Sequence, residues 1–238
     1  MAIGPFLAMT AAEIRNHSHF PRKIAWMACH FSPYGSGLSN LPHTLPEESL
    51  LILDDITPIH GHDPQIIARQ LLFCLDELRP SGILVDFQRP GYPEAAALVK
   101  YLSDVLPCPV AVSEYYADSV QIPVFLPPVP PSVPLLEYLK PWQNREIWLD
   151  ISTWGETLTL AEDGCTATSL PPWDTPEEGF PETSLHFHYR TFLKETSAEF
   201  TLWRTEADMK SFLEEAEDLG VSKAVGLYQE LKGLSSLT

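Results

Sequence analysis

The feature that most constrains the fold is an alternation of strand-like and helix-like segments in the first half of the chain. Apolar strand patterns cover residues 49–54, 81–90 and 109–113. Between them lie two amphipathic helix patterns, one opened by Asp63 and Pro64 and the other over residues 93–106. Strands that alternate with helices pair in parallel through right-handed crossovers, so this order predicts an α/β fold.

Further strand patterns begin near residues 23, 122, 146, 184 and 224, which raises the expected number to eight. Eight parallel strands in 238 residues predict a (β/α)8 TIM-like barrel, made irregular by missing or short helices. Alternating residues around Asp163-Gly164 indicate a β-hairpin insertion at about 154–170 in a single barrel domain spanning 1–238. Six prolines in residues 123–134 favour a rigid barrel loop over a proline-rich ligand motif.

The charge and the cysteine pattern limit the partners and the cellular compartment that we expect for this chain. Fifteen Lys+Arg against 32 Asp+Glu give a formal net charge of −17, which disfavours nucleic acid and membrane surfaces as partners. The four cysteines lie far apart without a C-x-x-C motif, so we expect buried free thiols. The N-terminal segment is a poor signal peptide and no apolar run is long enough for a membrane span, which predicts a cytoplasmic protein. The oligomeric state stays open.

Residues 81–90, SGILVDFQRP, carry the strongest indication of a site. The alternation of a strand puts Asp86 and Gln88 on one face and three apolar side chains on the other. Arg89 follows, so the segment ends in a carboxylate, an amide and a guanidinium. Barrel and open α/β folds place their ligand sites at the C-terminal ends of the strands, which makes these residues candidates for a pocket.

Three segments in the middle and the last third of the chain form a longer pattern. They are Ser81, Leu84, Asp86 and Gln88 followed by Arg89-Pro90, then IWLD ending at Asp150, then AEDLGVSKAVGLY ending at Tyr228. In order and spacing they resemble the chitinase-like glycoside hydrolases of family 18. That family carries D-x-x-D-x-D-x-E and commonly Tyr-Pro on one barrel strand, M-x-Y-D on a later one, and a closing A-x-x-x-G helix before a strand that ends in Trp.

The resemblance implies a carbohydrate or glycan-bearing ligand and a defect in catalysis. In the family the Glu protonates the leaving oxygen, while the preceding Asp orients the substrate's acetamido group as the nucleophile. Gln88 corresponds to that Glu and cannot donate the proton as an acid. Our first hypothesis is therefore a glycan-binding barrel without efficient hydrolysis, with Asp86, Gln88, Asp150 and Tyr228 in the cleft.

Other candidate residues also lie at strand ends. Glu114 or Asp54 can supply the second carboxylate of an active glycoside hydrolase with a rearranged site, although a solvated loop carboxylate is the simpler interpretation of Glu114. Tyr116 is a candidate for stacking on a sugar ring, with core packing as the alternative.

Two histidine pairs leave a metal-dependent hydrolase as a third hypothesis. His60 and His62 lie in one loop, and His186 and His188 share one strand face, so each pair can supply nitrogen ligands. The adjacent Asp63 is already explained as a helix cap. No Gly-rich phosphate loop, nucleophile elbow or dinucleotide fingerprint is present. We therefore assign no metal ligand and expect no cofactor.

Overall fold

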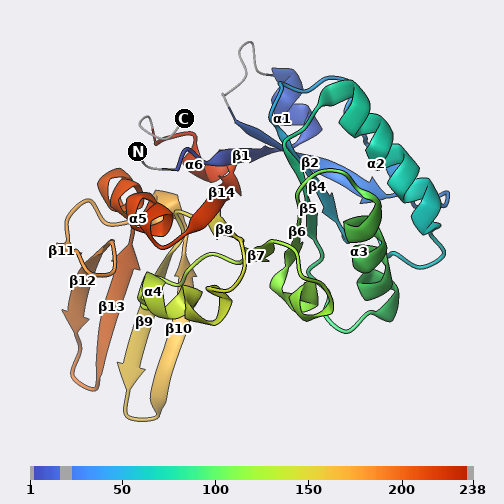
Figure 1. Ribbon diagram of the computed structural model, residues 1–238. Helices are drawn as coiled ribbons and strands as arrows, with labels where there is room; N and C mark the ends of the chain where they lie inside the picture. The colour runs from blue at the N-terminus through green and yellow to red at the C-terminus, as the bar shows by residue number, and fades with distance from the viewer. Residues whose placement is uncertain (1–2, 17–22, 235–238) are drawn as a thin grey trace.

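The computed structural model describes residues 3–16 and 23–234, and eight of its parallel strands close into a barrel (Figure 1). Their order around the barrel is β1-β14-β8-β7-β6-β5-β4-β2, and pairing of β1 with β2 closes the ring. The predicted (β/α)8 TIM-like barrel is therefore confirmed. Its strands are β1 (Phe6–Met9), β2 (Ile24–Phe31), β4 (Leu50–Asp54), β5 (Gly82–Asp86), β6 (Val110–Ser113), β7 (Val124–Leu126), β8 (Ile147–Ile151) and β14 (Val221–Leu227). The short β3 (Leu38–Ser39) pairs antiparallel with β2 outside the ring.

Two of the strand assignments change. The first barrel strand is β1, which the sequence patterns did not indicate, because FLAM is only four residues long. The prediction that residues 184–189 form a barrel strand is wrong, since β12 (Phe187–Leu193) pairs antiparallel in a separate sheet. Its alternation of polar and apolar residues fits a half-exposed antiparallel strand, whereas buried parallel strands read as continuous apolar runs.

The helices begin and end close to their sequence signals. Asp63 caps α2 (Pro64–Leu78) through its side chain, and Arg79 ends it in the left-handed conformation with φ of 50°. Thr205 and Asp208 form a capping box at the start of α5 (Glu206–Asp218). No helix in the described part of the chain is long and apolar enough to cross a membrane. The remaining helices are α1 (Ala11–Asn16), α3 (Pro93–Val105), α4 (Leu135–Leu139) and α6 (Tyr228–Leu231), with 3-10 turns at Glu114–Ser119, Lys140–Trp142 and Pro172–Asp174.

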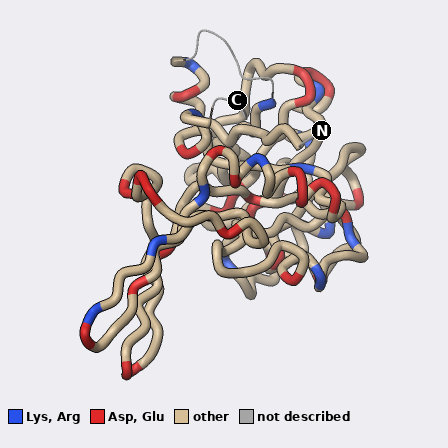
Figure 2. The backbone as a smooth tube through the Cα atoms, turned by 90° about the vertical axis from the view of Figure 1, so that its left-hand side faces the viewer, with Lys and Arg blue, Asp and Glu red and all other residues tan. Residues whose placement is uncertain are grey.

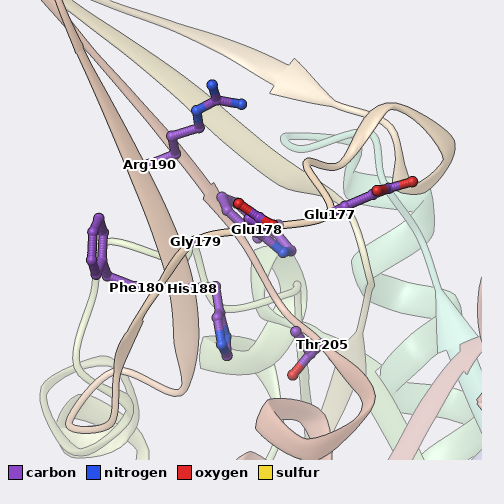
Figure 3. Close-up of a pocket in the computed structure, with 8 residues that line it drawn as sticks. Glu177, Glu178, Gly179, Phe180, His188, Arg190 and Thr205 are labelled. Atoms are coloured by element: carbon purple, nitrogen blue, oxygen red, sulfur yellow. The ribbon is translucent and has the colours of Figure 1, made fainter.

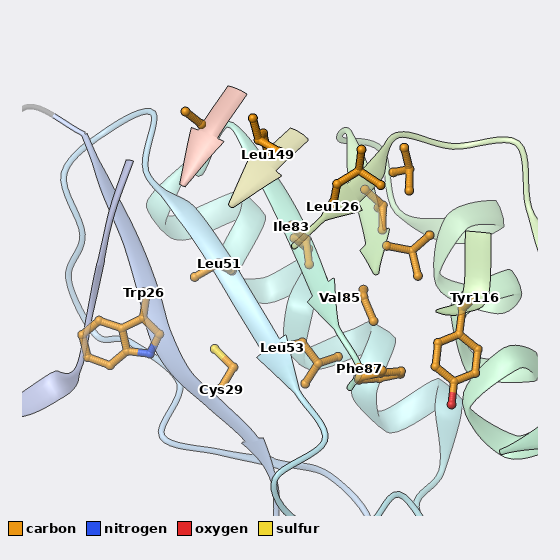
Figure 4. Packing of buried hydrophobic residues seen from close by; sticks show 14 of the residues in the cluster. Trp26, Cys29, Leu51, Leu53, Ile83, Val85, Phe87, Tyr116, Leu126 and Leu149 are labelled. Atoms are coloured by element: carbon orange, nitrogen blue, oxygen red, sulfur yellow. The ribbon is translucent and has the colours of Figure 1, made fainter. Parts of the chain in front are cut away.

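The core has two layers, and β5 contributes to both. Ile83, Val85 and Phe87 belong to the larger cluster between the strands and the helices (Figure 4). Leu84 points into the barrel interior, where the fully buried Trp148 belongs to the same cluster. A Cβ on Gly82 would lie 2.9 Å from that indole, so the base of β5 has room only for glycine. The predicted alternation therefore holds, and Asp86 and Gln88 belong to the interior face.

The remaining strands form a five-stranded antiparallel sheet of order β10-β9-β13-β12-β11, which we call the arm. The predicted hairpin is present as its first two strands, and the inserted sheet extends well beyond it. The arm projects from the barrel (Figures 1 and 2). Its strands are β9 (Gly155–Ala161), β10 (Gly164–Leu170), β11 (Phe180–Glu182), β12 and β13 (Ser197–Trp203).

The four cysteines are free thiols, and their burial differs. Cys29 and Cys74 are buried as predicted, and Cys108 is half-buried. The same expectation is wrong for Cys165, which is exposed on β10, because the arm has two solvent-facing sides at that point.

Candidate functional site

The C-terminal ends of three neighbouring strands place polar side chains in one row. His30 on β2 is the register partner of Asp54 on β4, and Asp54 is the partner of Asp86 on β5. The Nδ1 atom of His30 lies 2.7 Å from a carboxylate oxygen of Asp54. Because residues at matching positions in a parallel sheet point to the same side, these three groups share the interior face at the barrel mouth.

Gln88 is held at this mouth by two sets of hydrogen bonds. Its side-chain amide donates to the carboxylate of Asp86. The buried Asp55 accepts from the backbone N–H of Gln88 at 3.0 Å and from that of Arg89 at 3.1 Å. Arg89 also donates from its guanidinium to the carbonyl oxygen of Ile56 at 2.9 Å. These hydrogen bonds hold the loop that follows β5 against the residues at the end of β4.

The strand ends enclose two adjacent cavities that share Asp86 and Gln88. The first has a volume of about 310 Å³ and is lined by Asp86, Gln88, Ser113, Glu114, Tyr115, Phe125, Pro127, Pro128 and Asp150. The second has a volume of about 340 Å³ and is lined by Met27, Ile52, Asp54, Asp55, Ile56, Asp86, Gln88 and Arg89. Six predicted site residues therefore line one or both of these cavities: Asp54, Asp86, Gln88, Arg89, Glu114 and Asp150.

Burial and neighbouring negative charges raise the pKa values of two carboxyl groups that face this mouth. Desolvation raises the pKa of Asp86 to about 6, against the opposing effect of the Gln88 hydrogen bond and with support from the charges of Asp54 and Asp55. Desolvation also raises the pKa of Asp150 well above its ordinary value, with further contributions from the charges of Asp86 and Glu230. A carboxyl group with a raised pKa can donate a hydrogen bond near neutral pH as well as accept one.

Two of the predicted ligand-binding residues lie outside these cavities. Tyr116 is 4% exposed, packs edge-on against Phe87 and donates its hydroxyl hydrogen bond to the carbonyl oxygen of Arg89. It belongs to the outer core, and the adjacent Tyr115 lines the cavity instead. Tyr228 begins α6 and packs on the same outer core. The expected positions of both tyrosines in the pocket are therefore wrong, because the 3-10 turn and α6 start immediately at the strand ends and redirect the side chains.

Sequence reasoning missed two structural carboxylates at the mouth. Asp55 was visible only as the second acid after a strand, with no pattern to show that it would fasten the next loop. Glu230 accepts from the hydroxyl of Ser152 at 2.6 Å and from the backbone N–H of Thr153 at 3.3 Å. Because it joins two segments that are 78 residues apart, no local signal could have identified it.

The histidines have separate partners. His60 is exposed and lies 3.6 Å from Glu94, whereas the two ring nitrogens of His62 lie 2.8 and 3.0 Å from the carbonyl oxygens of Ile59 and Ser32. His186 contacts Glu215, and His188 lies 2.7 Å from Asp208. Among the described residues, no group of three or more His, Cys, Asp or Glu side chains is arranged to hold a metal ion.

A larger depression of about 630 Å³ lies at the base of the arm (Figure 3). It is lined by Glu177, Glu178, Gly179, Phe180, His188, Arg190, Trp203 and Thr205. None of the residues that line the barrel mouth contributes to it. We therefore place the candidate functional site at the mouth, where charged groups converge from several strands.

Neither a family model nor a curated protein sequence matches the chain. Solved structures do match over nearly its whole length. A chitinase from Chromobacterium violaceum is 11% identical with a TM-score of 0.58, covering 98% of this chain and 97% of its own. A chitinase-like agglutinin from Robinia pseudoacacia is 11% identical with a TM-score of 0.60, covering 94% of each chain. A family 18 chitinase from Cycas revoluta, with one Glu-to-Gln and one Gly-to-Trp substitution and solved with (GlcNAc)4, is 9% identical with a TM-score of 0.57 and covers 94% of each chain.

Proposed function

Because the chain has the barrel fold of the chitinase-like glycoside hydrolases of family 18, we propose that it binds a carbohydrate or glycan-bearing ligand without hydrolysing it efficiently. The proposed binding site is the C-terminal mouth of the barrel. The observation that carries the proposal is the convergence of Asp86, Gln88, Glu114 and Asp150 on one cavity, with a neutral amide where the family has its proton donor.

The chemistry of the mouth fits a ligand rich in hydroxyl groups. Carboxylates accept hydrogen bonds, the Gln88 amide offers both donors and an acceptor, and raised pKa values let Asp86 and Asp150 act as donors as well. Tyr115 and Phe125 add aromatic surface to the same cavity, and an aromatic ring can pack on the apolar C–H face of a pyranose. A mixture of aromatic side chains and several polar groups is typical of ligand pockets.

The same residues argue against efficient turnover by the family mechanism. Loss of a general acid costs on the order of 10² to 10⁴ in rate, and Gln88 cannot serve as one. Two further acids of the family motif are also replaced. Ser81 donates its hydroxyl to the carbonyl oxygens of Glu48 and Ser49, and Leu84 is part of the apolar barrel interior. With Ser81 and Leu84 at these positions, the strand lacks the two carboxyl groups that precede the position of Asp86 in the family motif.

Two of the structural neighbours support a binding function. One is described as a chitinase-like agglutinin, and the other is a chitinase with a Glu-to-Gln substitution in complex with (GlcNAc)4. The same fold is therefore found in a protein described by a binding activity, and a chitinase with a Glu-to-Gln substitution has been solved with an oligosaccharide bound.

Calorimetry of the full chain against chitin, peptidoglycan and plant oligosaccharides tests the proposal. We expect binding to at least one class, weakened in Asp86→Ala and unchanged in Asp104→Asn, which alters an exposed carboxylate on α3. Absence of binding across all three classes would refute the proposal.

An active hydrolase with a rearranged carboxylate pair is a second candidate function. Its support is that Glu114 lines the same cavity as Asp86, and that the pKa of Asp86, raised to about 6 by burial, suits a proton donor near neutral pH. Release of chromophore from a panel of chromogenic glycosides distinguishes this candidate from the first.

A further inference from the structure

The arm is an amphipathic sheet, because its register divides the side chains between two unlike faces. Residues paired across an antiparallel ladder point to the same side. One face, which we call the apolar face, carries in its two outer rows Leu158, Leu160, Cys165, Ala167, Leu193, Ala198 and Phe200, with Thr191 as the polar exception. Its inner row, nearer the barrel, consists of Tyr189, Leu202, Glu156 and Ser169. The opposite face carries Thr157, Thr159, Thr166, Thr168, Arg190, Glu199 and Thr201, together with Phe192.

The described residues leave the outer part of the apolar face uncovered. Leu160 is 44% exposed and Leu193 is 76% exposed, whereas Leu202, nearer the barrel, is 6% exposed. In Figure 2 the two hairpins of the arm stand clear of the barrel. On the opposite face, by contrast, the exposed ring of Phe192 lies under the ammonium group of Lys194 at 5.9 Å. An antiparallel sheet with one polar face normally buries the other, so the apolar face lacks the cover that its pattern predicts.

We propose that the apolar face of the arm packs against the same face of a second copy of this chain. The two outer rows of this face carry no ionised side chain and the inner row carries only Glu156, while the whole chain has a formal net charge of −17. Two copies therefore approach with the least repulsion at this surface. Packing a face on itself about a two-fold axis is self-complementary and closes the assembly as a dimer, with the two sheets about 10 Å apart.

The composition of the face favours protein over other occupants. Its side chains are mostly aliphatic, and only Phe200 in the outer rows and Tyr189 in the inner row offer rings for stacking on sugars. A membrane surface that carries anionic lipids would repel a chain of this charge. A second copy needs neither ring stacking nor opposite charge, since apolar burial alone drives its association.

The size of the face sets the expected affinity. Four strands about 4.8 Å apart, each about seven residues long at about 3.4 Å per residue, cover about 450 Å². Two copies would bury about 900 Å² in total, which is the size of a weak, transient interface. We therefore expect a dissociation constant on the order of 10 µM.

Sedimentation equilibrium of the full chain between about 1 and about 200 µM tests the proposal. We expect the wild-type chain to pass from monomer to dimer across this range. Leu160→Glu and Leu193→Glu should each weaken the dimer at least about tenfold, because each buries two carboxylates in the interface. The matched control Thr159→Glu adds the same charge to the opposite face and should leave the dimer unchanged.

Circular dichroism establishes that the variants fold, and Leu193→Glu is the safer variant because its site is 76% exposed in the single chain. The proposal is overturned if the wild-type chain stays monomeric at all concentrations, or if its dimer survives Leu193→Glu unchanged. A monomeric chain that binds phosphatidylcholine vesicles or chitin through this face would equally overturn it. No glycan is present in the dimer measurement, so its outcome is independent of the proposed function.

Discussion

The side-chain amide of Gln88 donates a hydrogen bond to the carboxylate of Asp86 at the mouth of the barrel. The bond opposes the effect of burial on the pKa of Asp86 and keeps that carboxylate available as an acceptor. A glutamic acid at position 88 would instead compete with Asp86 for protons, because two neighbouring carboxyl groups cannot both ionise easily. An amide at this position therefore leaves Asp86 available as an acceptor and cannot itself donate a proton as an acid.

Gln88→Ala should weaken oligosaccharide binding about fivefold, since one hydrogen bond contributes about 1 kcal/mol and its loss leaves Asp86 without this partner. It should also move the pKa of Asp86 above about 6, because the bond that lowers it is gone. Calorimetry measures the first effect and carboxyl-carbon NMR titration the second. An unchanged Asp86 titration would show that the amide does not hold this carboxylate in solution.

Asp86→Asn should stabilise the protein in alkaline solution. The pKa of Asp86 in the folded chain, about 6, lies above its ordinary value of 3.8. The folded state therefore holds the Asp86 proton more tightly than the unfolded state, and the stability that this provides is complete below about pH 4 and is lost as the pH rises through 6. The variant should be more stable by about 3 kcal/mol at pH 8 and equal to the wild type near pH 4. Urea unfolding at both pH values measures the difference, and equal stability at pH 8 would contradict it.

The part of the site that could be predicted from the sequence depends on a local period. The alternation within β5 separated Asp86 and Gln88 from Ile83, Val85 and Phe87, and parallel pairing then brought Glu114 and Asp150 to the same cavity. The period of two is enforced by the apolar barrel interior on one side and the helix layer on the other. A residue inside a strand can therefore be assigned to a face from its sequence position alone.

The incorrect predictions concern residues just past the end of a strand and one strand that is too short to show a period. Tyr116 and Tyr228 lie just past strand ends, where the 3-10 turn and α6 replace the alternation and turn both rings toward the outer core. The strand Phe6–Met9 is too short to show a period, and only its pairing with β2 and β14 identifies it. Such positions are decided by contacts between distant segments, which a single sequence does not display.

Asp55→Ala should disturb both the fold and the binding site. The carboxylate is 6% exposed and accepts the backbone N–H groups of Gln88 and Arg89, so its removal leaves two donors without this partner. We expect a loss of about 2 to 3 kcal/mol in the free energy of unfolding and weaker oligosaccharide binding. Asp55→Asn keeps one acceptor oxygen and should lose less. Equal losses in the two variants would show that the carboxylate does not fasten this loop.

Glu114→Gln separates the two candidate functions. If the chain binds glycans without turnover, neither the wild type nor the variant releases chromophore from chromogenic glycosides, and the variant's binding changes only modestly, because an amide still offers an acceptor oxygen in the cavity. If Asp86 and Glu114 form a rearranged catalytic pair, the wild type releases chromophore and the variant loses on the order of 10² to 10⁴ in rate. The rate of a working pair should also fall as the pH rises above about 6, where Asp86 loses its proton. Activity that persists in Glu114→Gln would exclude Glu114 from the reaction, and activity that is insensitive to pH near 6 would exclude Asp86 as its acid.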